Sequence, residues 1–467
     1  MRSGARFNGC VRAAGAMLMI LLSAIAVGTI SLLLAYCLPT ASMQDHMRDS
    51  SIVFQNEGTY PVASLACSRV LDNFTDSKML LTAAYPGSEP VVEKAMMGYS
   101  HRVVGVDPVE SLIVEYGDDA SSMDDRQMST TAYSRYWQGY LVILKPLLML
   151  FDYQAIRYVN CVMFVLLTIA VAVMLWRRLS LIHVIAFALT AICLAPLAVV
   201  QSLQYSSIAY ISLLAMLAVM VLWEKVRSSY LSLGMLFFLV GIVTSYFDFL
   251  TYPVVALGFP LITYLVMAQE PSRQAFPKAV YASFIWLLGY GCFWASKWLV
   301  AVLIMGDVGI VEDAIGQAAV RSALNAGLND QSLPELGLLD GLIVNIQVFF
   351  DCAINDVIVC IGCAACLIGL VTAWRRRRFR LSSIAPFVFV AFLPLIWYLG
   401  MGNHSVAHSF FTFRDLSVSV YALLAIAAVL LKSSFGTPPE QEDSVDAVGV
   451  SCRSAKAYRR LHQGGQW

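Results

Sequence analysis

The sequence AGAMLMILLSAIAVGTISLLLAYC, residues 14–37, contains 24 residues and no charged side chain. A helix needs about 20 apolar residues to cross the hydrocarbon core of a bilayer, so this stretch predicts a membrane-spanning helix. It is longer than the apolar region of a secretory signal peptide, and no small-x-small cleavage pattern follows it. We therefore expect a signal anchor that stays attached to the chain.

The whole chain has the composition of a membrane protein. Of its 467 residues, 59% are hydrophobic and 13% are charged, and the mean hydropathy is +0.70. Soluble domains contain about half apolar and about a quarter charged residues, which excludes a soluble enzyme and a disordered chain. The 31 basic residues balance the 31 acidic ones, so no excess charge points to nucleic acid. The 11 cysteines show neither a disulfide framework nor the spacing of zinc ligands.

Similar apolar runs recur along the chain and are separated by polar residues. They predict an all-α polytopic membrane protein with about ten transmembrane helices, whose boundaries are defined only to within several residues. The runs cover approximately residues 14–37, 156–176, 181–200, 208–223, 231–246, 250–267, 279–305, 357–374, 384–399 and 416–431.

Basic residues near the ends of these runs predict the orientation, because they are retained on the cytoplasmic side during insertion. Arg2, Arg6 and Arg12 place the N-terminus inside. Helix parity then places inside four connections that together hold 11 basic residues, whereas the outer connections after the first loop hold only Arg321 and Arg414. We expect a multi-pass protein of the cell membrane with both termini in the cytoplasm.

Long polar segments divide the chain further. The first outer loop carries 14 acidic and 7 basic residues over positions 38–138. An apolar stretch at 139–151 is too short to span and contains Pro146, which predicts an interfacial or re-entrant helix. The predicted parts are a cytoplasmic N-terminus with the first transmembrane helix (1–37), an α-rich extracytoplasmic loop domain (38–155), helices two to seven (156–305), a second outer segment (306–356), helices eight to ten (357–431) and a disordered cytoplasmic tail (432–467).

Two acids of the first outer loop are candidates for chemistry. Asp72 and Asp76 are four residues apart, which places them on one face of a helical turn. Such a pair can hold a divalent metal, bind sugar hydroxyls or supply a general base. The alternative is that Asp72 caps a helix and Asp76 is solvated.

Cationic and aromatic residues form a second group of candidates. Arg135 lies beside Tyr136 and Trp137, just before the short apolar stretch, and Arg157 opens the second helix from the same side. This pattern is typical of an aromatic belt at the membrane surface. It also fits an arginine that pairs with a lipid phosphate while an aromatic ring stacks on a sugar.

Further candidates lie in two later outer connections. Asp248 stands between two phenylalanines, where it must be hydrated, paired or neutral. His404 and His408 have helical spacing and precede Arg414. They can hold a metal or contact a phosphate, although no H-E-x-x-H signature is present. The alternative is an ordinary polar hairpin.

This layout resembles the GT-C superfamily of integral-membrane glycosyltransferases, which have one anchor helix, a large acidic outer loop and a polytopic body. It is also similar to uncharacterised bacterial membrane proteins of surface-polysaccharide pathways in the cell envelope. The strings that carry this second similarity are D-N-F-T-D at 72–76, S-R-Y-W-Q-G-Y at 134–140, S-Y-F-D-F-L-T at 245–251 and N-H-S-V-A-H at 403–408.

The resemblance implies a hexosyltransferase that uses a polyprenyl-phosphate sugar as its donor, in contact with membrane lipids. A first-loop acid acts as base or contacts metal, which points to Asp72 and Asp76, or to Asp45 because it follows the first helix closely. The arginines would bind the donor phosphate. The acceptor is an extracytoplasmic glycan, lipid or protein, and a divalent metal is left open. Two alternatives are a membrane acyltransferase with His404 or His408 as base, and a flippase or transporter for lipid-linked glycans.

Overall fold

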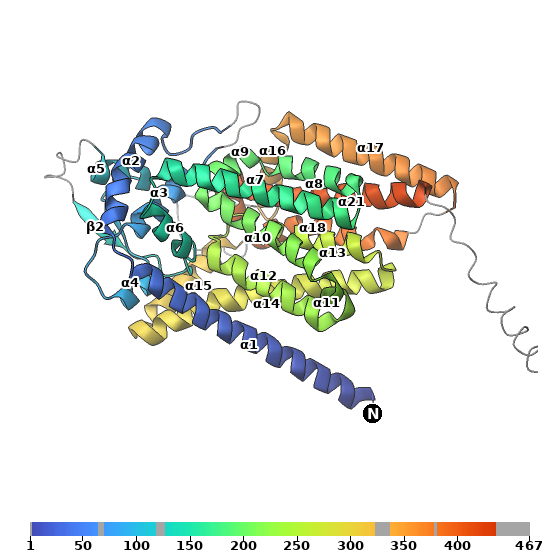
Figure 1. Ribbon diagram of the computed structural model, residues 1–467, viewed down its shortest axis with the longest axis horizontal. Helices are drawn as coiled ribbons and strands as arrows, with labels where there is room; N and C mark the ends of the chain where they lie inside the picture. Colours follow the sequence, from blue (N-terminus) through green and yellow to red (C-terminus); the bar gives the residue numbers. More distant parts are fainter. Residues whose placement is uncertain (1, 64–69, 118–126, 323–336, 378–380, 436–467) are drawn as a thin grey trace, which may run out of the picture.

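The computed structural model describes residues 2–63, 70–117, 127–322, 337–377 and 381–435. Long helices lie side by side in a bundle, and shorter helices and strands gather at one end of it (Figure 1). The N-terminal end of the first helix lies toward the other end. The prediction of a helical, polytopic membrane protein is confirmed in this general form.

Within the described residues, seven helices contain segments that are long and apolar enough to cross a membrane. They coincide with seven of the ten predicted apolar runs, so the predicted number of ten is not confirmed. These helices are α1 (Arg2–Tyr36), α7 (Tyr153–Arg178), α10 (Leu203–Val221), α12 (Tyr230–Phe247), α14 (Ser272–Met305), α17 (Ala353–Arg375) and α21 (Leu416–Phe435).

The other three predicted runs form shorter helices, namely α8 (Leu181–Cys193), α13 (Val254–Ala268) and α18 (Ala385–Gly400). The first is interrupted where Ala195 adopts a left-handed conformation and Pro196 starts α9 (Pro196–Gln201). Every residue from Val254 to Val266 in α13 is buried, which makes this helix part of the protein core rather than a lipid-facing element.

Helices α12 and α14 pack closely against each other, and two glycines permit the approach. A Cβ atom on Gly241 would lie 2.2 Å from the carbonyl oxygen of Trp286, and one on Gly289 would lie 2.3 Å from that of Phe238. Small residues allow helix backbones to approach closely inside a membrane. Helix α14 also contacts the loop domain described next, and the position of α14 therefore depends on these two residues.

The loop domain consists of α2 (Ala41–Glu57), α3 (Asn73–Ala83), α4 (Val91–Met97), β1 (Ser100–Val103), α5 (Pro108–Tyr116) and β2 (Met128–Thr131). It is rich in helix, as expected, and the two strands pair in antiparallel fashion with Ser100 opposite Thr131. The sequence analysis did not predict this ribbon. The short helix expected within residues 139–151 is α6 (Leu141–Leu148), which contains Pro146.

Shorter elements complete the described chain. The segment between α14 and α17 contains α15 (Gly309–Arg321) and α16 (Asp340–Phe350). The connections and the last hairpin contain α11 (Trp223–Ser228), η2 (Leu381–Ser383), α19 (Gly402–Ala407), α20 (Ser409–Thr412) and η3 (Phe413–Asp415). Most of the predicted disordered tail, from position 436 onward, lies outside the described residues.

Two buried lysines attach the loop domain to the rest of the protein. Lys145 of α6 donates a hydrogen bond to the carbonyl oxygen of Ala83, at the end of α3, with a length of 2.6 Å. Lys297 of α14 donates one of 2.6 Å to the carbonyl oxygen of Met96, at the end of α4. The last carbonyls of a helix lack intrahelical partners and carry partial negative charge, which favours a cation there. Both lysines therefore cap helices and hold the domain in place.

Candidate functional site

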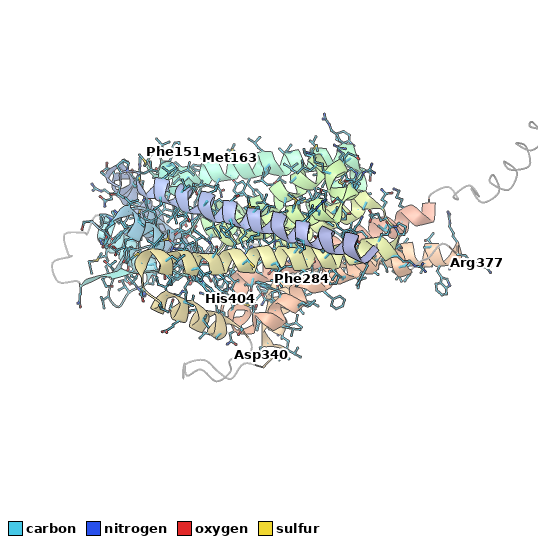
Figure 2. The ribbon with its side chains drawn as sticks, turned by 90° about the horizontal axis from the view of Figure 1, so that it is seen from below. Phe151, Met163, Phe284, Asp340, Arg377 and His404 are labelled. Carbon is cyan, nitrogen blue, oxygen red and sulfur yellow. The ribbon has the colours of Figure 1, made fainter. Side chains whose placement is uncertain are left out.

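A cavity of about 310 Å³ lies where the loop domain meets the last hairpin. Its charged and titratable walls are Asp72 and Lys78 from the loop domain, Arg321 from the end of α15, and His404 and His408 from the hairpin. Figure 2 shows His404 in the half of the molecule that holds Phe151. Aromatic residues form much of the remaining wall: Tyr60, Phe74, Tyr133, Tyr140, Phe249, Phe410 and Phe411. We call this space the central cavity.

Asp72 combines a structural contact with a position in the cavity wall. Its Oδ1 accepts a hydrogen bond of 3.0 Å from the backbone amide of Thr75, so it caps α3 as one of the two alternatives predicted. Burial raises the pKa of Asp72 to about 7, and the nearby carboxylate of Asp76 adds to this. A carboxyl group that titrates near neutral pH is well suited to accept a proton during catalysis.

Asp76 has a different environment although it lies only one turn away. Its carboxylate accepts hydrogen bonds from the amides of Leu203 and Gln204, at 2.8 and 3.0 Å, and from the hydroxyl of Tyr153 at 2.6 Å. The amides belong to the first turn of α10, whose N–H groups lack intrahelical partners. Asp76 is fully buried, so the expectation that it is solvated is wrong. Asp76 lies outside the central cavity. It caps α10, which is far from it in the sequence.

Asp45 lies on α2 and is exposed. It contributes nothing to the wall of the central cavity, and the neighbouring His46 is engaged with the carbonyl oxygen of Leu148 at 2.8 Å. The structure thus separates the three acids that the sequence singled out, because only Asp72 reaches the cavity.

Most of the guanidinium nitrogens of Arg157 and Arg414 are used in contacts inside the protein, and Nε of Arg157 and Nη2 of Arg414 have no hydrogen-bond partner among the described residues. Arg157 donates two hydrogen bonds to Glu57, at 2.7 and 3.0 Å, and one of 3.1 Å to Asn73. Arg414 is completely buried, and it donates to the carbonyl oxygens of Leu194 and Phe410 at 3.0 and 3.2 Å. Neither arginine lines the central cavity. Their arrangement fits a structural function rather than the predicted contact with a phosphate.

The aromatic residues beside Arg135 are buried between the loop domain and α14, and not at the lipid surface as a membrane belt requires. Trp137 is fully buried, and its indole N–H donates a hydrogen bond of 2.8 Å to the carbonyl oxygen of Phe293. The hydroxyl of Tyr136 accepts a hydrogen bond from Arg321. Tyr136 therefore positions a cation of the central cavity.

Asp248 organises the loop that holds His404. Its carboxylate accepts hydrogen bonds from the amides of Leu250 and Thr251, at 2.9 and 3.1 Å. The carbonyl oxygen of Leu250 then faces Nε2 of His404 at 2.7 Å. Because a carbonyl oxygen only accepts, Nε2 carries the proton and Nδ1 has a free lone pair. This Nδ1 has no hydrogen-bond partner among the described residues.

The two histidines are adjacent and uncharged at neutral pH. Their ring centroids are 4.6 Å apart. Burial lowers the pKa of His408 to about 4 and that of His404 well below its ordinary value. They can therefore contact a substrate by hydrogen bonds, whereas Lys78 and Arg321 supply the positive charge of the cavity. Within the described ranges, no group of three or more histidine, cysteine, aspartate or glutamate residues is arranged to hold a metal ion.

Lys78 and Arg321 are the two cations of the central cavity, and the sequence did not mark either as a site residue. Arg321 carries a recognisable signal, because it is the lone basic residue among eight acidic ones in the segment 307–356. Lys78 carries a weaker one, since it lies two residues after Asp76 and one helical turn beyond Phe74.

A second cavity, of about 390 Å³, opens between the membrane helices. It is formed by residues of α6, α7, α10 and α12, and its lining is mostly apolar. Met79 and Tyr140 line both this cavity and the central cavity. Val159 and Met163 of α7 form part of its exposed edge, and Figure 2 marks Met163 on that helix. We call this space the apolar groove.

Comparisons with protein-family models, with curated proteins and with solved structures find no match to this chain. The resemblance to membrane glycosyltransferases therefore stays a prediction that rests on the sequence layout. The geometry of the two adjoining cavities provides a separate basis for a functional hypothesis.

Proposed function

We propose that the protein is a membrane glycosyltransferase that moves a sugar from a polyprenyl-phosphate donor to an extracytoplasmic acceptor. The observation that carries this proposal is the shared wall of Met79 and Tyr140, which joins a polar cavity to an apolar groove between membrane helices. A substrate with a charged head and a long isoprenoid tail has this combination of properties. Neither cavity alone would favour a lipid-linked donor over other substrates.

Each part of the donor has a matching part of the protein. The isoprenoid tail lies in the apolar groove, where it stays in apolar surroundings as it does in the bilayer. The phosphate meets Lys78 and Arg321 in the central cavity. These cations stabilise the negative charge that develops on the phosphate as the sugar departs.

Asp72 is the proposed general base. Its carboxylate removes the proton from an acceptor hydroxyl, whose oxygen forms a new bond to the anomeric carbon of the sugar. The bond between that carbon and the phosphate oxygen breaks, and polyprenyl phosphate leaves with the bonding electrons. Asp72 is the only one of the three predicted acids that lines the cavity.

The distribution of charge favours an extracytoplasmic site. Arg178 and Arg227 lie in the last turns of α7 and α11, and these helix ends lie away from the loop domain in Figure 1. Figure 2 shows Arg377 at the end of the molecule opposite Phe151. Basic residues of this kind are retained in the cytoplasm. Cys352, just before α17, is disulfide-bonded, which is typical of an oxidising compartment. We infer that α8, α13 and α18 supply the three further crossings that give both termini a cytoplasmic location.

The proposal is tested with purified protein in lipid nanodiscs supplied with a radiolabelled polyprenyl-phosphate hexose and a membrane extract as the source of acceptor. Release of polyprenyl phosphate together with transfer of label to acceptor supports the proposal. The variant Asp72→Asn should lack this activity, and Asp45→Asn, which changes an exposed acid outside the cavity, should retain it. Failure of wild-type protein to release polyprenyl phosphate from any hexose donor would exclude the proposed reaction.

A membrane acyltransferase is the second candidate, and one observation favours it. His404 is neutral, its tautomer is set by the carbonyl oxygen of Leu250, and its Nδ1 is free to accept a proton. A histidine general base needs a free nitrogen of this kind, although burial makes His404 less basic than an ordinary histidine. Consumption of an acyl thioester in the same nanodisc preparation, abolished by His404→Gln and unaffected by Asp72→Asn, would select this candidate.

A further inference from the structure

A third cavity, of about 220 Å³, lies within the loop domain on the other side of Lys78. Among the described residues, it is lined by four basic side chains, those of Lys78, His101, Arg102 and Arg135, and by no aspartate or glutamate. We call it the cationic cavity. This concentration of positive charge is unexpected in a loop with 14 acidic and 7 basic residues over positions 38–138.

Arg135 is held in the wall by its backbone, and its side chain forms one ion pair and lies over the ring of Tyr133. Its carbonyl oxygen accepts hydrogen bonds from the indole N–H groups of Trp294 and Trp298, at 3.0 and 3.1 Å. The guanidinium group has a carboxylate near it, that of the half-exposed Asp313, at 3.6 Å. Its Nε is buried and has no hydrogen-bond partner in the described part of the chain. A buried donor without a partner is costly unless a ligand satisfies it.

The other basic groups of the cavity have different partners among the described residues. Lys78 lies over the ring of Tyr133, with its Nζ 3.6 Å from the ring centroid. Arg102 is exposed and donates from Nε to the carbonyl oxygen of Val106 at 3.3 Å. His101 is paired with Glu115 at 3.0 Å. Burial lowers the pKa of Lys78, and repulsion from Arg135 and Arg102 lowers it further, so these charges destabilise one another.

The cationic cavity adjoins the central cavity and is separate from the apolar groove. It shares Phe74, Lys78 and Tyr133 with the central cavity, and none of its lining residues contributes to the apolar groove. A ligand bound here thus lies next to the central cavity, which Asp72 lines, without occupying the place of a lipid tail. Two hydroxyl groups, those of Ser100 and Thr131, add neutral hydrogen-bonding groups to the wall.

We propose that the cationic cavity binds a carboxylate or phosphate group of the acceptor, so that the sugar is transferred to an anionic glycan. The identification of this glycan as the acceptor rests on the proposed glycosyltransferase function. The binding of an anionic glycan to the cavity does not depend on that function. The acidic group is anchored by Arg102 and Arg135, whose planar guanidinium groups suit oxyanions. A neighbouring hydroxyl of the same glycan then reaches Asp72 past Lys78.

The binding experiment requires no donor and no turnover. Wild-type protein in nanodiscs of phosphatidylcholine is titrated by calorimetry with three oligosaccharides of equal length: a uronic-acid oligomer, a glycerol-phosphate oligomer and a neutral glucose oligomer. The two anionic probes separate carboxylate from phosphate as the recognised group. The double variant Arg102→Gln with Arg135→Gln is compared with Arg178→Gln, which removes an exposed charge at the end of α7 far from the loop domain.

At least one anionic oligomer should bind wild-type protein more tightly than the neutral one, with an affinity that falls as salt increases. The double variant should weaken this binding by about tenfold or more, because each charge-assisted hydrogen bond contributes a substantial part of the affinity. Lysine at both positions should restore most of it, and Arg178→Gln should change nothing.

Three outcomes would overturn the inference. The first is equal binding of anionic and neutral oligomers by wild-type protein. The second is undiminished anion binding by a double variant that is monodisperse and unfolds like wild type. The third comes from titration with polyprenyl phosphate. If the double variant loses the binding of this lipid and Arg321→Gln retains it, the cationic cavity belongs to the donor. Failure of the transferase assay alone leaves the measured anion binding intact, which distinguishes the two proposals.

Discussion

Replacement of Asp72 by asparagine should abolish activity and at the same time stabilise the protein at alkaline pH. Asparagine and aspartate are about equally good at capping a helix, so the amide oxygen can keep the hydrogen bond from Thr75. The substitution removes the negative charge and the ability to accept a proton while preserving the size of the side chain. It therefore isolates the chemistry from the helix cap.

The magnitude follows from the pKa of the buried carboxyl group. Burial raises the pKa of Asp72 from 3.8 to about 7, and each pKa unit corresponds to about 1.4 kcal/mol. Since the pKa is higher in the folded state, the stability that depends on the neutral carboxyl is complete below about pH 4 and is lost as pH rises through about 7. The upper bound of this loss is about 4 kcal/mol. The asparagine side chain of the variant stays neutral at every pH, so the variant does not lose this stability.

Thermal unfolding monitored by tryptophan fluorescence at about pH 5 and about pH 8 measures the stability difference. The advantage of Asp72→Asn should be larger at the higher pH. Transferase turnover of the same preparations should fall by about 10² to 10⁴ in the variant, which is the usual contribution of a general base. Wild-type activity should rise with pH and level off above about pH 7 as the carboxyl ionises. An active variant, or one that is less stable than wild type at the higher pH, would refute the assignment of Asp72.

Three further substitutions test other parts of the structure. Asp76→Ala should lower the free energy of unfolding by about 3 kcal/mol or more, measured by denaturant titration, because it leaves the amides at the start of α10 without their acceptor. Gly241→Ala should cost about 1–3 kcal/mol by separating α12 from α14, whereas Gly291→Ala, where a Cβ meets no atom within 4 Å, should unfold like wild type. Arg321→Gln should raise KM for the lipid-linked donor by about tenfold with a smaller effect on kcat, which initial-rate kinetics would detect.

The sequence predicted the helices well because each membrane crossing leaves a long apolar signal of its own. The run at 384–399 is short and contains Pro386 and Pro394, so the sequence indicated the short α18. It did not predict the short α8 and α13, because the break at Pro196 and the complete burial of α13 depend on local conformation and on neighbouring elements. The β1–β2 ribbon was missed for a similar reason. Its two strands have four residues each and are paired across a long insertion.

The site was predicted only in part because spacing along a helix does not tell which neighbour a side chain meets. Asp72 and Asp76 lie one turn apart, yet one lines a cavity and the other accepts hydrogen bonds from residues more than 120 positions away. His404, a predicted substrate contact, lines the central cavity, and its tautomer depends on Leu250, which no local pattern reveals. Long-range contacts of this kind are set by the packing of the loop domain.

The buried cations of this protein fall into two groups, those with a structural role and those that line a cavity. Lys145, Lys297 and Arg414 donate to backbone carbonyl oxygens, and Arg157 donates to Glu57, so most of their donors hold the loop domain and the hairpin in place. Lys78 and Arg321 instead face aromatic rings and hydroxyl groups, which leave most of a positive charge uncompensated. Buried charge without an opposite partner is costly. A bound anion relieves that cost, and for this reason the cations that lack carboxylates mark the places where we expect substrate.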